Sequence, residues 1–448
     1  MTATHTTATP GGDTASSAEA TVGTRVRDAR LSAGMTQSAL AGDRFSKEYV
    51  SQIERGRTLA PKATLEWIAE RLGTDAELLA TGVSSLRREQ MEAIIARADA
   101  AIARADYEAA LTELEPLQAE TTIPAALALR AHLARSWSLM YAGKPQEALD
   151  VLADARALAE RDLFDDVDRA EVMYRMGCCR YRLSSIASAT ALFDQALELA
   201  ERGARPCDRL RAHVLEWRSR CYRRQRDWQA AHDDIERALE LGQGLDDHET
   251  VAHVLFQASL VAERQGRFEL ARDYAESARA RYETLADRVN VGRLLNNLGG
   301  LSFLLGDSNR AVEQLKSAFS IALDVESDSD AGYAVSSLAQ VHLRRGEHAL
   351  AERCAREALD LLGERPDVLD EVGNARLVLG RALIQQARTD EARVVLEAAE
   401  RAMAGTGSAS HHAAVWVAQG DLDTQQGEHE RAAVLYRQAA EALQDFHF

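Results

Sequence analysis

The sequence predicts an all-α protein in which five short helices precede a solenoid of about nine helical hairpins. Alanine recurs nine times in steps of 38 to 42 residues, and a period of about 40 residues is typical of a solenoid. The composition favours helices, and the 448 residues include only seven prolines. Because a solenoid presents an extended surface, the repeats also indicate a binding role.

The N-terminal residues 1–20 are rich in Thr, Ala, Ser and Gly, and they lack the basic start and apolar stretch of a signal peptide. We therefore expect a disordered tail. The chain contains no run of eighteen apolar residues, so no membrane helix is expected. Five cysteines without framework spacing are typical of a protein in the reducing cytoplasm.

Residues 21–82 are predicted to form the five-helix domain, in which capping residues and a proline begin helices. The first helix is expected near residues 24–33, the second behind Thr36, the third behind Ser46, the fourth at Pro61, and the fifth behind a capping box of Thr74 and Glu77. Residues 21–62 carry eight basic and four acidic side chains, although the whole chain has a net charge of −17. Such a basic island is typical of a small DNA-reading module or of an ordinary solvated face.

The segment MTQSALAGDRFSKEYVSQIERGR, residues 35–57, is followed by LEWIAERLG, residues 65–73. Together they resemble the XRE family of helix-turn-helix DNA-binding domains, the lambda-repressor type. In such a motif the second helix crosses the DNA backbone and the third helix enters the major groove. The turn at residues 42–45 is one residue shorter than the common family pattern, and we expect Phe45 to fill the slot of a smaller aliphatic residue.

The resemblance implies that the exposed side of the third helix reads DNA. Lysine can pair with guanine, glutamine with adenine, and glutamate can accept a hydrogen bond from cytosine. Arginines at the helix end and Gln37 would bind phosphates, while Tyr49 would contact a thymine methyl group or cover the backbone. The predicted DNA-binding residues are Gln37, Ser46, Lys47, Glu48, Tyr49, Gln52, Arg55 and Arg57. A solvated helix face is the alternative for Lys47, Glu48 and Gln52.

Two further charged residues of the five-helix domain are expected to have a structural role. The resemblance implies that Arg30 and Glu54 form an internal ion pair that ties the first helix to the third. Val50 and Ile53 are expected to point into the core of the domain.

Residues 83–448 are predicted to form the repeat domain. A small residue precedes each repeat alanine by twelve positions, so that antiparallel helices can approach closely. The repeat alanines are Ala110, Ala148, Ala189, Ala231, Ala271, Ala311, Ala351, Ala392 and Ala432. Their spacing, with Leu298-Gly299 and Gly306-Asp307, resembles the tetratricopeptide repeat. The longer period is similar to the sensor domains of bacterial regulators that join an XRE module to such repeats, of which peptide-sensing quorum regulators are the best known.

The first helix of each tetratricopeptide repeat usually lines the concave face, so counting back from each alanine gives groove-facing positions. The predicted groove residues are Arg175, Arg182, His213, Trp217, Arg220, Arg224, Gln257, Arg264, Arg293, Asn297, Gln340 and Arg344. Amides can pair with a peptide backbone and arginines with carboxylates, which is the chemistry that a short peptide needs. The alternative is that these side chains pair with acidic residues of neighbouring helices.

These features predict a cytoplasmic, sequence-specific transcription regulator whose partners are double-stranded DNA and a peptide or protein ligand. A homodimer through the repeat domain is expected, because one module usually needs a second half-site. An interaction scaffold with secondary DNA binding, or repeats that only dimerise, are the alternatives.

Neither an enzyme nor a cofactor is predicted, since no phosphate-binding glycine loop or Gly-x-Ser-x-Gly elbow is found. No metal is predicted either, because His248 and His253 lie five positions apart, about 140° around a helix.

Overall fold

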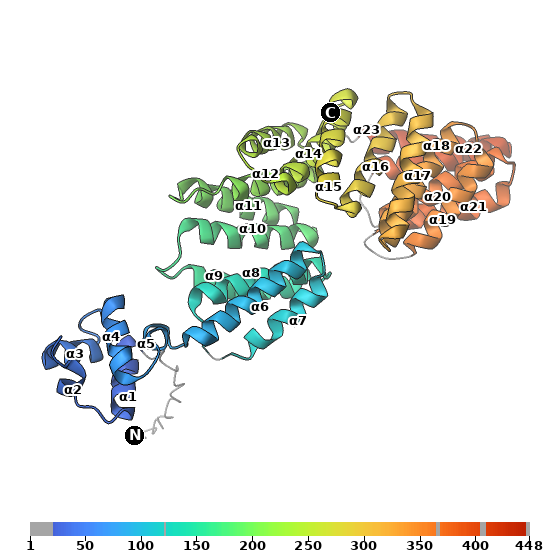
Figure 1. The fold of residues 1–448 in the computed structure, drawn as a ribbon. Coiled ribbons are helices and arrows are strands. Elements are labelled where there is room, and N and C mark those ends of the chain that lie inside the picture. Colours follow the sequence, from blue (N-terminus) through green and yellow to red (C-terminus); the bar gives the residue numbers. More distant parts are fainter. Residues whose placement is uncertain (1–20, 121, 364–367, 404–408, 445–448) are drawn as a thin grey trace, which may run out of the picture. The chain divides into compact units, whose positions relative to one another are not determined.

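The computed structural model describes residues 21–120, 122–363, 368–403 and 409–444 (Figure 1). Within these residues the regular elements are helices, α1 to α23, with no strand, which confirms the predicted all-α class. None of the described helices is long and apolar enough to cross a membrane. The chain divides into two compact units, Met1–Ser185 and Ile186–Phe448. The tail expected at residues 1–20 lies outside the described residues.

The first five helices lie in the range that was predicted for the N-terminal domain, residues 21–82. They are α1 (Val22–Ser32), α2 (Gln37–Ala41), α3 (Lys47–Glu54), α4 (Lys62–Leu72) and α5 (Ala76–Thr81). Both predicted N-caps are confirmed, since the hydroxyls of Thr36 and Ser46 each accept a hydrogen bond from a backbone amide of the following helix at 3.1 Å.

The predicted cap of α5 is wrong. Asp75, not Thr74, accepts the hydrogen bond from the backbone amide of Glu77, at 2.7 Å. Thr74 still belongs to the end of α4, because its amide donates to the carbonyl of Ala69 behind the left-handed Gly73. Because α5 begins at Ala76, the residue directly before it is Asp75, which is therefore the N-cap.

The core of the N-terminal domain is built on a close contact between α1 and α3. A Cβ atom on Gly23 would lie only 2.3 Å from the carbonyl oxygen of Ile53, so the two backbones meet where α1 has no side chain. Val50 and Ile53 are buried in this core, as predicted. Phe45 packs at its edge, with its ring centroid 5.0 Å from that of Trp67 in an edge-to-face arrangement.

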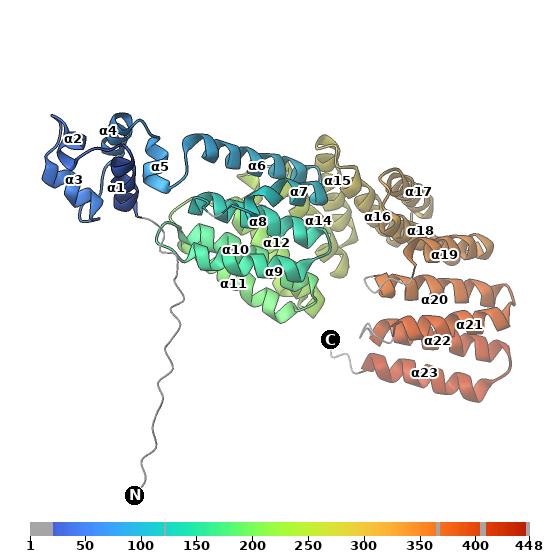
Figure 2. The same ribbon diagram turned by 90° about the horizontal axis from the view of Figure 1, so that it is seen from below.

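The repeat helices follow in the predicted order. In the first unit they are α6 (Ser85–Ala103), α7 (Tyr107–Gln118), α8 (Ala125–Tyr141), α9 (Pro145–Ala159) and α10 (Asp166–Arg182). In the second unit they are α11 (Ile186–Arg202), α12 (Asp208–Gln225), α13 (Trp228–Gln243), α14 (His248–Arg264), α15 (Phe268–Thr284), α16 (Arg288–Leu304), α17 (Ser308–Asp324), α18 (Asp328–Arg344), α19 (His348–Leu362), α20 (Leu369–Gln385), α21 (Thr389–Met403), α22 (Ala409–Gln425) and α23 (His429–Gln444). Within each unit, consecutive repeat helices pack against one another, as Figure 2 shows for α20 to α23.

The repeat alanines mark the contact between the two helices of a hairpin. All nine are at most 2% exposed. Where the small residue of the first helix is glycine, the residue four positions after the alanine can be large. A Cβ on Gly299 would lie 2.5 Å from Leu315, and one on Gly380 would lie 2.5 Å from Leu396. The alanine pattern therefore indicates close packing of the two helices of a hairpin. Large side chains of the second helix lie over glycines of the first.

A left-handed residue ends the first helix of each repeat. The residue five positions before every repeat alanine has a positive φ, between 58° and 90°. Glycine occupies five of these nine turns, and the other four contain Ala105, Ser184, Arg226 and Ala387. Positive φ is costly for a residue with a side chain, so these four hairpins carry backbone strain.

Candidate DNA-binding and ligand-binding sites

Helix α3 presents one polar face to solvent. Lys47, Glu48 and Gln52 are exposed, whereas Val50 and Ile53 on the opposite side are 0% and 2% exposed. The N-cap Ser46 is also exposed. The structure thus brings the three predicted base-reading side chains to one accessible side of the helix, which is the geometry that a major groove admits.

The loop after α3 adds a contact that the sequence did not indicate. The hydroxyl of Thr58 donates a hydrogen bond to the side-chain oxygen of Gln52 at 3.1 Å. Arg55 and Arg57 are exposed on either side of Gly56, whose φ of +65° sharply turns the chain. Both arginines are therefore accessible to the phosphates that they were predicted to bind.

The predicted ion pair between Arg30 and Glu54 is confirmed, with Nε 2.5 Å from Oε1. Gln37 joins it, because its Nε2 donates to Oε2 of Glu54 at 2.9 Å. Burial raises the pKa of the Glu54 carboxyl, but the hydrogen bonds from Arg30 and Gln37 outweigh it and leave that pKa below its usual range. The structure therefore places Gln37 in an internal network, while its phosphate contact remains a prediction.

Tyr49 lies half-buried at the edge of the same domain. Its ring centroid is 5.1 Å from that of Phe45, and the guanidinium of Arg71 lies over Trp67 at 5.0 Å. Arg71 also donates to the carbonyl of Ala39 in α2, at 2.9 Å. Tyr49 thus belongs to an aromatic cluster that fixes the start of α3, and both of its predicted DNA roles stay open.

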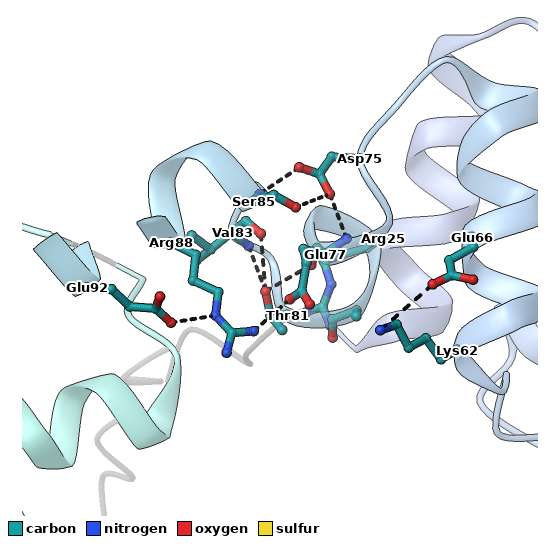
Figure 3. Close-up of polar contacts among 11 residues, drawn as sticks. Arg25, Lys62, Glu66, Asp75, Glu77, Thr81, Val83, Ser85, Arg88 and Glu92 are labelled. Atoms are coloured by element: carbon teal, nitrogen blue, oxygen red, sulfur yellow. Dashed lines mark hydrogen bonds and ion pairs between the residues drawn. The ribbon is translucent and has the colours of Figure 1, made fainter. Parts of the chain in front are cut away.

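Hydrogen bonds join the N-terminal domain to the first repeat helix (Figure 3). Asp75 accepts from the backbone amide of Ser85 at 2.6 Å and from its hydroxyl at 3.0 Å. The backbone hydrogen bond from Ser85 is the largest cause of the lowered pKa of Asp75. Arg88 of α6 reaches Glu77 at 3.3 Å, and Arg25 of α1 donates to the backbone carbonyls of Leu79 and Ala80 at the end of α5.

The predicted groove residues of the first unit are engaged within the protein. Arg175 donates to Glu171 at 2.8 Å and to the carbonyl of Leu133 at 3.0 Å, and it lies over the ring of Trp137. Arg182 lies over the ring of Tyr141, 5.1 Å from its centroid. The acidic partner of Arg175 lies on its own helix, α10, and not on a neighbouring helix as the alternative expected.

In the second unit, the groove residues of α12 are also held by neighbours. Trp217 is 4% exposed and lies beneath the guanidinium of Arg220 at 4.4 Å. Arg220 in turn pairs with the buried Glu216 at 2.5 Å. On α14, Gln257 is buried and accepts a hydrogen bond from Arg223 at 2.5 Å.

Other predicted groove positions are reachable from solvent. Arg224, Arg264, Gln340 and Arg344 are exposed, and His213 is half-buried, with Nε2 3.2 Å from the hydroxyl of Thr250. Arg293 is also exposed, but its Nε lies 3.0 Å from Asp330 of α18. The predicted groove residues therefore do not act as one set, because some of their arginines pair with acidic side chains and others are exposed.

Asn297 links two first helices of neighbouring repeats. Its side-chain oxygen accepts from Ser259 at 2.9 Å, and its nitrogen donates to Glu263 at 3.1 Å. Burial raises the pKa of Glu263, which favours the neutral acid in this position.

A cavity of about 410 Å³ brings Arg293 and Asn297 together. Its walls come from α14, α16, α17 and α18, and they are formed by Phe256, Leu260, Gly292, Arg293, Asn296, Asn297, Ala318, Asp330 and Tyr333. Sequence reasoning missed Asn296, Asp330 and the apolar walls. The adjacent amides Asn296-Asn297 were the available signal, since only one of the two was counted as facing the groove.

The histidines and cysteines outside the candidate sites have structural surroundings. His253 Nδ1 lies 2.7 Å from the hydroxyl of the buried Tyr282. Among the described residues, no group of three His, Cys, Asp or Glu side chains is arranged to hold a metal ion. Burial raises the pKa of Cys179 to about 12 and that of Cys221 to about 11, so neither thiol is ionised near neutral pH.

Comparison with known families identifies two segments of the chain. A family model described as a helix-turn-helix domain matches residues 21–81, and one described as a tetratricopeptide repeat matches residues 210–284. The chain therefore contains an N-terminal helix-turn-helix DNA-binding domain and a tetratricopeptide repeat domain. No curated protein sequence matches the chain.

Solved structures share the repeat fold at low sequence identity. The apo form of the quorum sensor NprR from B. thuringiensis is 13% identical with a TM-score of 0.61, and the match covers 80% of this chain and 99% of that one. A Rap protein solved in complex with Competence and Sporulation Factor is 17% identical with a TM-score of 0.56, and the match covers 80% and 98%. At these identities the similarity establishes the fold.

Proposed function

We propose that the protein is a sequence-specific transcription regulator that reads DNA with α3 and binds a peptide in its repeat domain. The exposed side of α3 carries the proposal, because Lys47, Glu48 and Gln52 reach solvent from a helix that Val50 and Ile53 anchor in the core. Side chains of these types form hydrogen bonds with base edges.

The sensing part of the proposal rests on the cavity between α14, α16 and α18. This cavity contains an arginine, two asparagines and apolar walls, which together suit a peptide. NprR is a quorum sensor, and the Rap protein was solved with Competence and Sporulation Factor bound. Shared fold with these proteins supports a similar sensing role here.

A homodimer completes the proposal. One helix-turn-helix module reads one half-site, and two modules at fixed spacing read a palindrome. We propose that the repeat domain joins two copies inside the cell and that the peptide changes the spacing of their α3 helices. Such a ligand acts only if it binds one of the two arrangements more tightly than the other.

DNA reading is tested by selecting bound fragments from genomic DNA and measuring their affinity by gel shift. Lys47→Ala and Gln52→Ala should each weaken specific binding by about 1–3 kcal/mol, roughly tenfold to a hundredfold. Lys62→Ala is the matched control, since this exposed lysine lies on α4, away from α3 in the sequence, and pairs there with Glu66 at 3.9 Å (Figure 3). Unchanged selectivity in both α3 variants would refute base reading, and failure of the wild type to select any sequence would favour a scaffold.

The sensing and dimerisation parts need separate measurements. Mass spectrometry of material that copurifies with the full chain from its own cells should find a peptide, and sedimentation should find two copies per complex. Combined Arg293→Ala and Asn297→Ala substitutions should abolish the response of DNA binding to that peptide. A response that persists would locate the ligand elsewhere.

A further inference from the structure

The cavity between α14, α16 and α18 combines three different chemistries within about 410 Å³. Its size falls within the range of about 300–1,000 Å³ that is typical of small-ligand sites. Phe256, Leu260 and Tyr333 supply large apolar and aromatic surface, and Gly292 and Ala318 keep part of the wall free of bulk. These walls suit one bulky apolar side chain.

Asn296 supplies an acceptor that the protein leaves unused. Its side-chain oxygen is buried, and among the described residues no hydrogen-bond donor reaches it. Leaving a buried acceptor unpaired costs free energy, so buried polar atoms without a partner are rare in folded proteins. Asn296 lines the cavity, so a rotation of its amide would bring this oxygen within reach of a ligand N–H group.

Arg293 supplies a cation at the same cavity. Its Nε contacts both carboxylate oxygens of Asp330, at 3.0 and 3.1 Å, and its side chain remains 49% exposed. Among the described residues, the guanidinium of Arg293 donates to Asp330 through Nε. Its two terminal nitrogens can therefore bind another acceptor. Arginine binds carboxylates with two parallel hydrogen bonds, and the exposed edge offers that geometry.

In the last residue of a peptide, the Cα atom carries an amide N–H group, a side chain and a free carboxylate. An apolar residue at this position therefore offers all three groups together. We propose that this cavity binds the free C-terminal residue of a peptide, and that this residue is bulky and apolar. Its amide donates to Asn296, its side chain fills the space beside Phe256 and Leu260, and its carboxylate pairs with Arg293. The inference rests on the proposed peptide sensing and specifies which end of the peptide the protein reads.

A peptide library presented in two orientations tests this inference separately from sensing itself. One copy is immobilised through its N-terminus, so that its C-termini are free, and the other is immobilised through its C-terminus. Retention of the full-length protein on the first copy, with enrichment of apolar last residues, is expected. Equal retention on both copies would overturn the C-terminal assignment but leave peptide sensing intact, whereas retention on neither would overturn both.

Three small probes then examine the groups one at a time by ligand-observed NMR. N-acetyl-L-phenylalanine carries the N–H, the ring and the carboxylate. N-acetyl-L-phenylalaninamide lacks the carboxylate, and 3-phenylpropanoic acid lacks the N–H. The first should bind at least about tenfold more tightly than either of the others, because each lost contact is a hydrogen bond to a charged or buried group. Equal binding of all three would overturn the assignment.

Variants link the probes to the named side chains. Arg293→Gln should remove the preference for the acid over the amide while the amide still binds, a result that misfolding could not produce. Arg288→Gln is the matched control, since Arg288 lies on the same helix and pairs with Asp324 at 2.6 Å, outside the cavity lining. Leu260→Trp should block all three probes by filling the space. Preserved discrimination in Arg293→Gln would assign the carboxylate to another residue and overturn the proposal.

Discussion

Gln37 donates a hydrogen bond to Glu54 at 2.9 Å, so the first residue of α2 is tied to the last residue of α3. Arg30 of α1 reaches the same carboxylate at 2.5 Å. One buried acidic group thus joins three of the five helices of the N-terminal domain, and the relative placement of α2 and α3 depends on it.

Replacing this carboxylate should destabilise the N-terminal domain. In Glu54→Gln, the guanidinium of Arg30, only 8% exposed, loses its countercharge, which costs about 3 kcal/mol for a buried pair. Hydrogen exchange of residues 21–81 should accelerate accordingly. Glu66→Gln, which removes an exposed partner of Lys62, should change the stability by less than about 0.5 kcal/mol. Equal exchange in the two variants would contradict a structural role for the Glu54 carboxylate.

The same carboxylate should make the stability of the domain depend on pH. Its folded-state pKa lies below its unfolded value, which is about 4.3 for glutamate. The stabilisation is therefore fully present above about pH 4.3 and is lost as the pH falls through the lower folded-state pKa. Acid titration of the domain's unfolding should reveal this loss in the wild type and a smaller one in Glu54→Gln. Identical acid profiles would show that other carboxylates are responsible.

Arg57 should contribute to DNA affinity without contributing to sequence preference. An arginine that neutralises one phosphate releases counterions, so Arg57→Ala should reduce the slope of log affinity against log salt by about one. All DNA sequences should be weakened similarly. Gel shifts over a salt series, with a specific and a scrambled fragment, measure both effects. A variant that alters the ratio between the two fragments would indicate base contact instead.

Adjacent glycines in α16 should respond in opposite directions to alanine. In Gly299→Ala the new Cβ would lie 2.5 Å from Leu315, and overpacking of this kind costs about 1–3 kcal/mol. In Gly300→Ala no atom lies within 4 Å of the new Cβ, so higher helix propensity should stabilise the helix by about 0.5–1 kcal/mol. Thermal unfolding of the full chain ranks them. In a Leu315→Ala background, Gly299→Ala should cost less stability than it does in the wild type, and an equal cost in both backgrounds would place the strain elsewhere.

Strained turns offer a stabilising substitution. Ala387 has a φ of 58°, which costs a residue with a Cβ about 1–2 kcal/mol, whereas glycine adds about 0.5–1 kcal/mol of unfolded-state entropy. Ala387→Gly should therefore stabilise the protein by up to about 1 kcal/mol. The reverse change in an equivalent turn, Gly427→Ala at a φ of 81°, should destabilise it. Chemical denaturation measures both, and the same sign in both variants would contradict the explanation.

Much of the fold could be predicted from local signals. N-capping hydroxyls at Thr36 and Ser46 act within three residues, so the sequence around them was sufficient. The repeat alanines were readable because identical packing recurs at a fixed period. The cap of α5 was misassigned because Thr74 and Glu77 match a capping pattern one residue too early, while Asp75, also a good capping residue, directly precedes the helix.

The candidate ligand site was less predictable, since its contacts cross from one repeat to the next. Counting positions found Arg293 and Asn297, but the partners of these residues, Asp330 and Glu263, lie 37 and 34 residues away. A sequence pattern gives the side of the helix that a residue occupies, and it does not reveal which neighbouring helix supplies the countercharge. The unpaired oxygen of Asn296 is likewise a property of the assembled repeats alone.

The bonds between Asp75 and Ser85 have a mechanical consequence. They connect the first turn of α5 directly to the first turn of α6, while residues 82–84 form the covalent link. A displacement of the start of α6 is therefore transmitted to the start of α5 through the Asp75 carboxylate. It is also transmitted to the end of α5 through the covalent chain. Arg25 donates hydrogen bonds to the carbonyls at the end of α5 and so couples α5 to α1. The DNA-binding domain is thus connected to the first repeat helix at two points, through these hydrogen bonds and through the covalent chain.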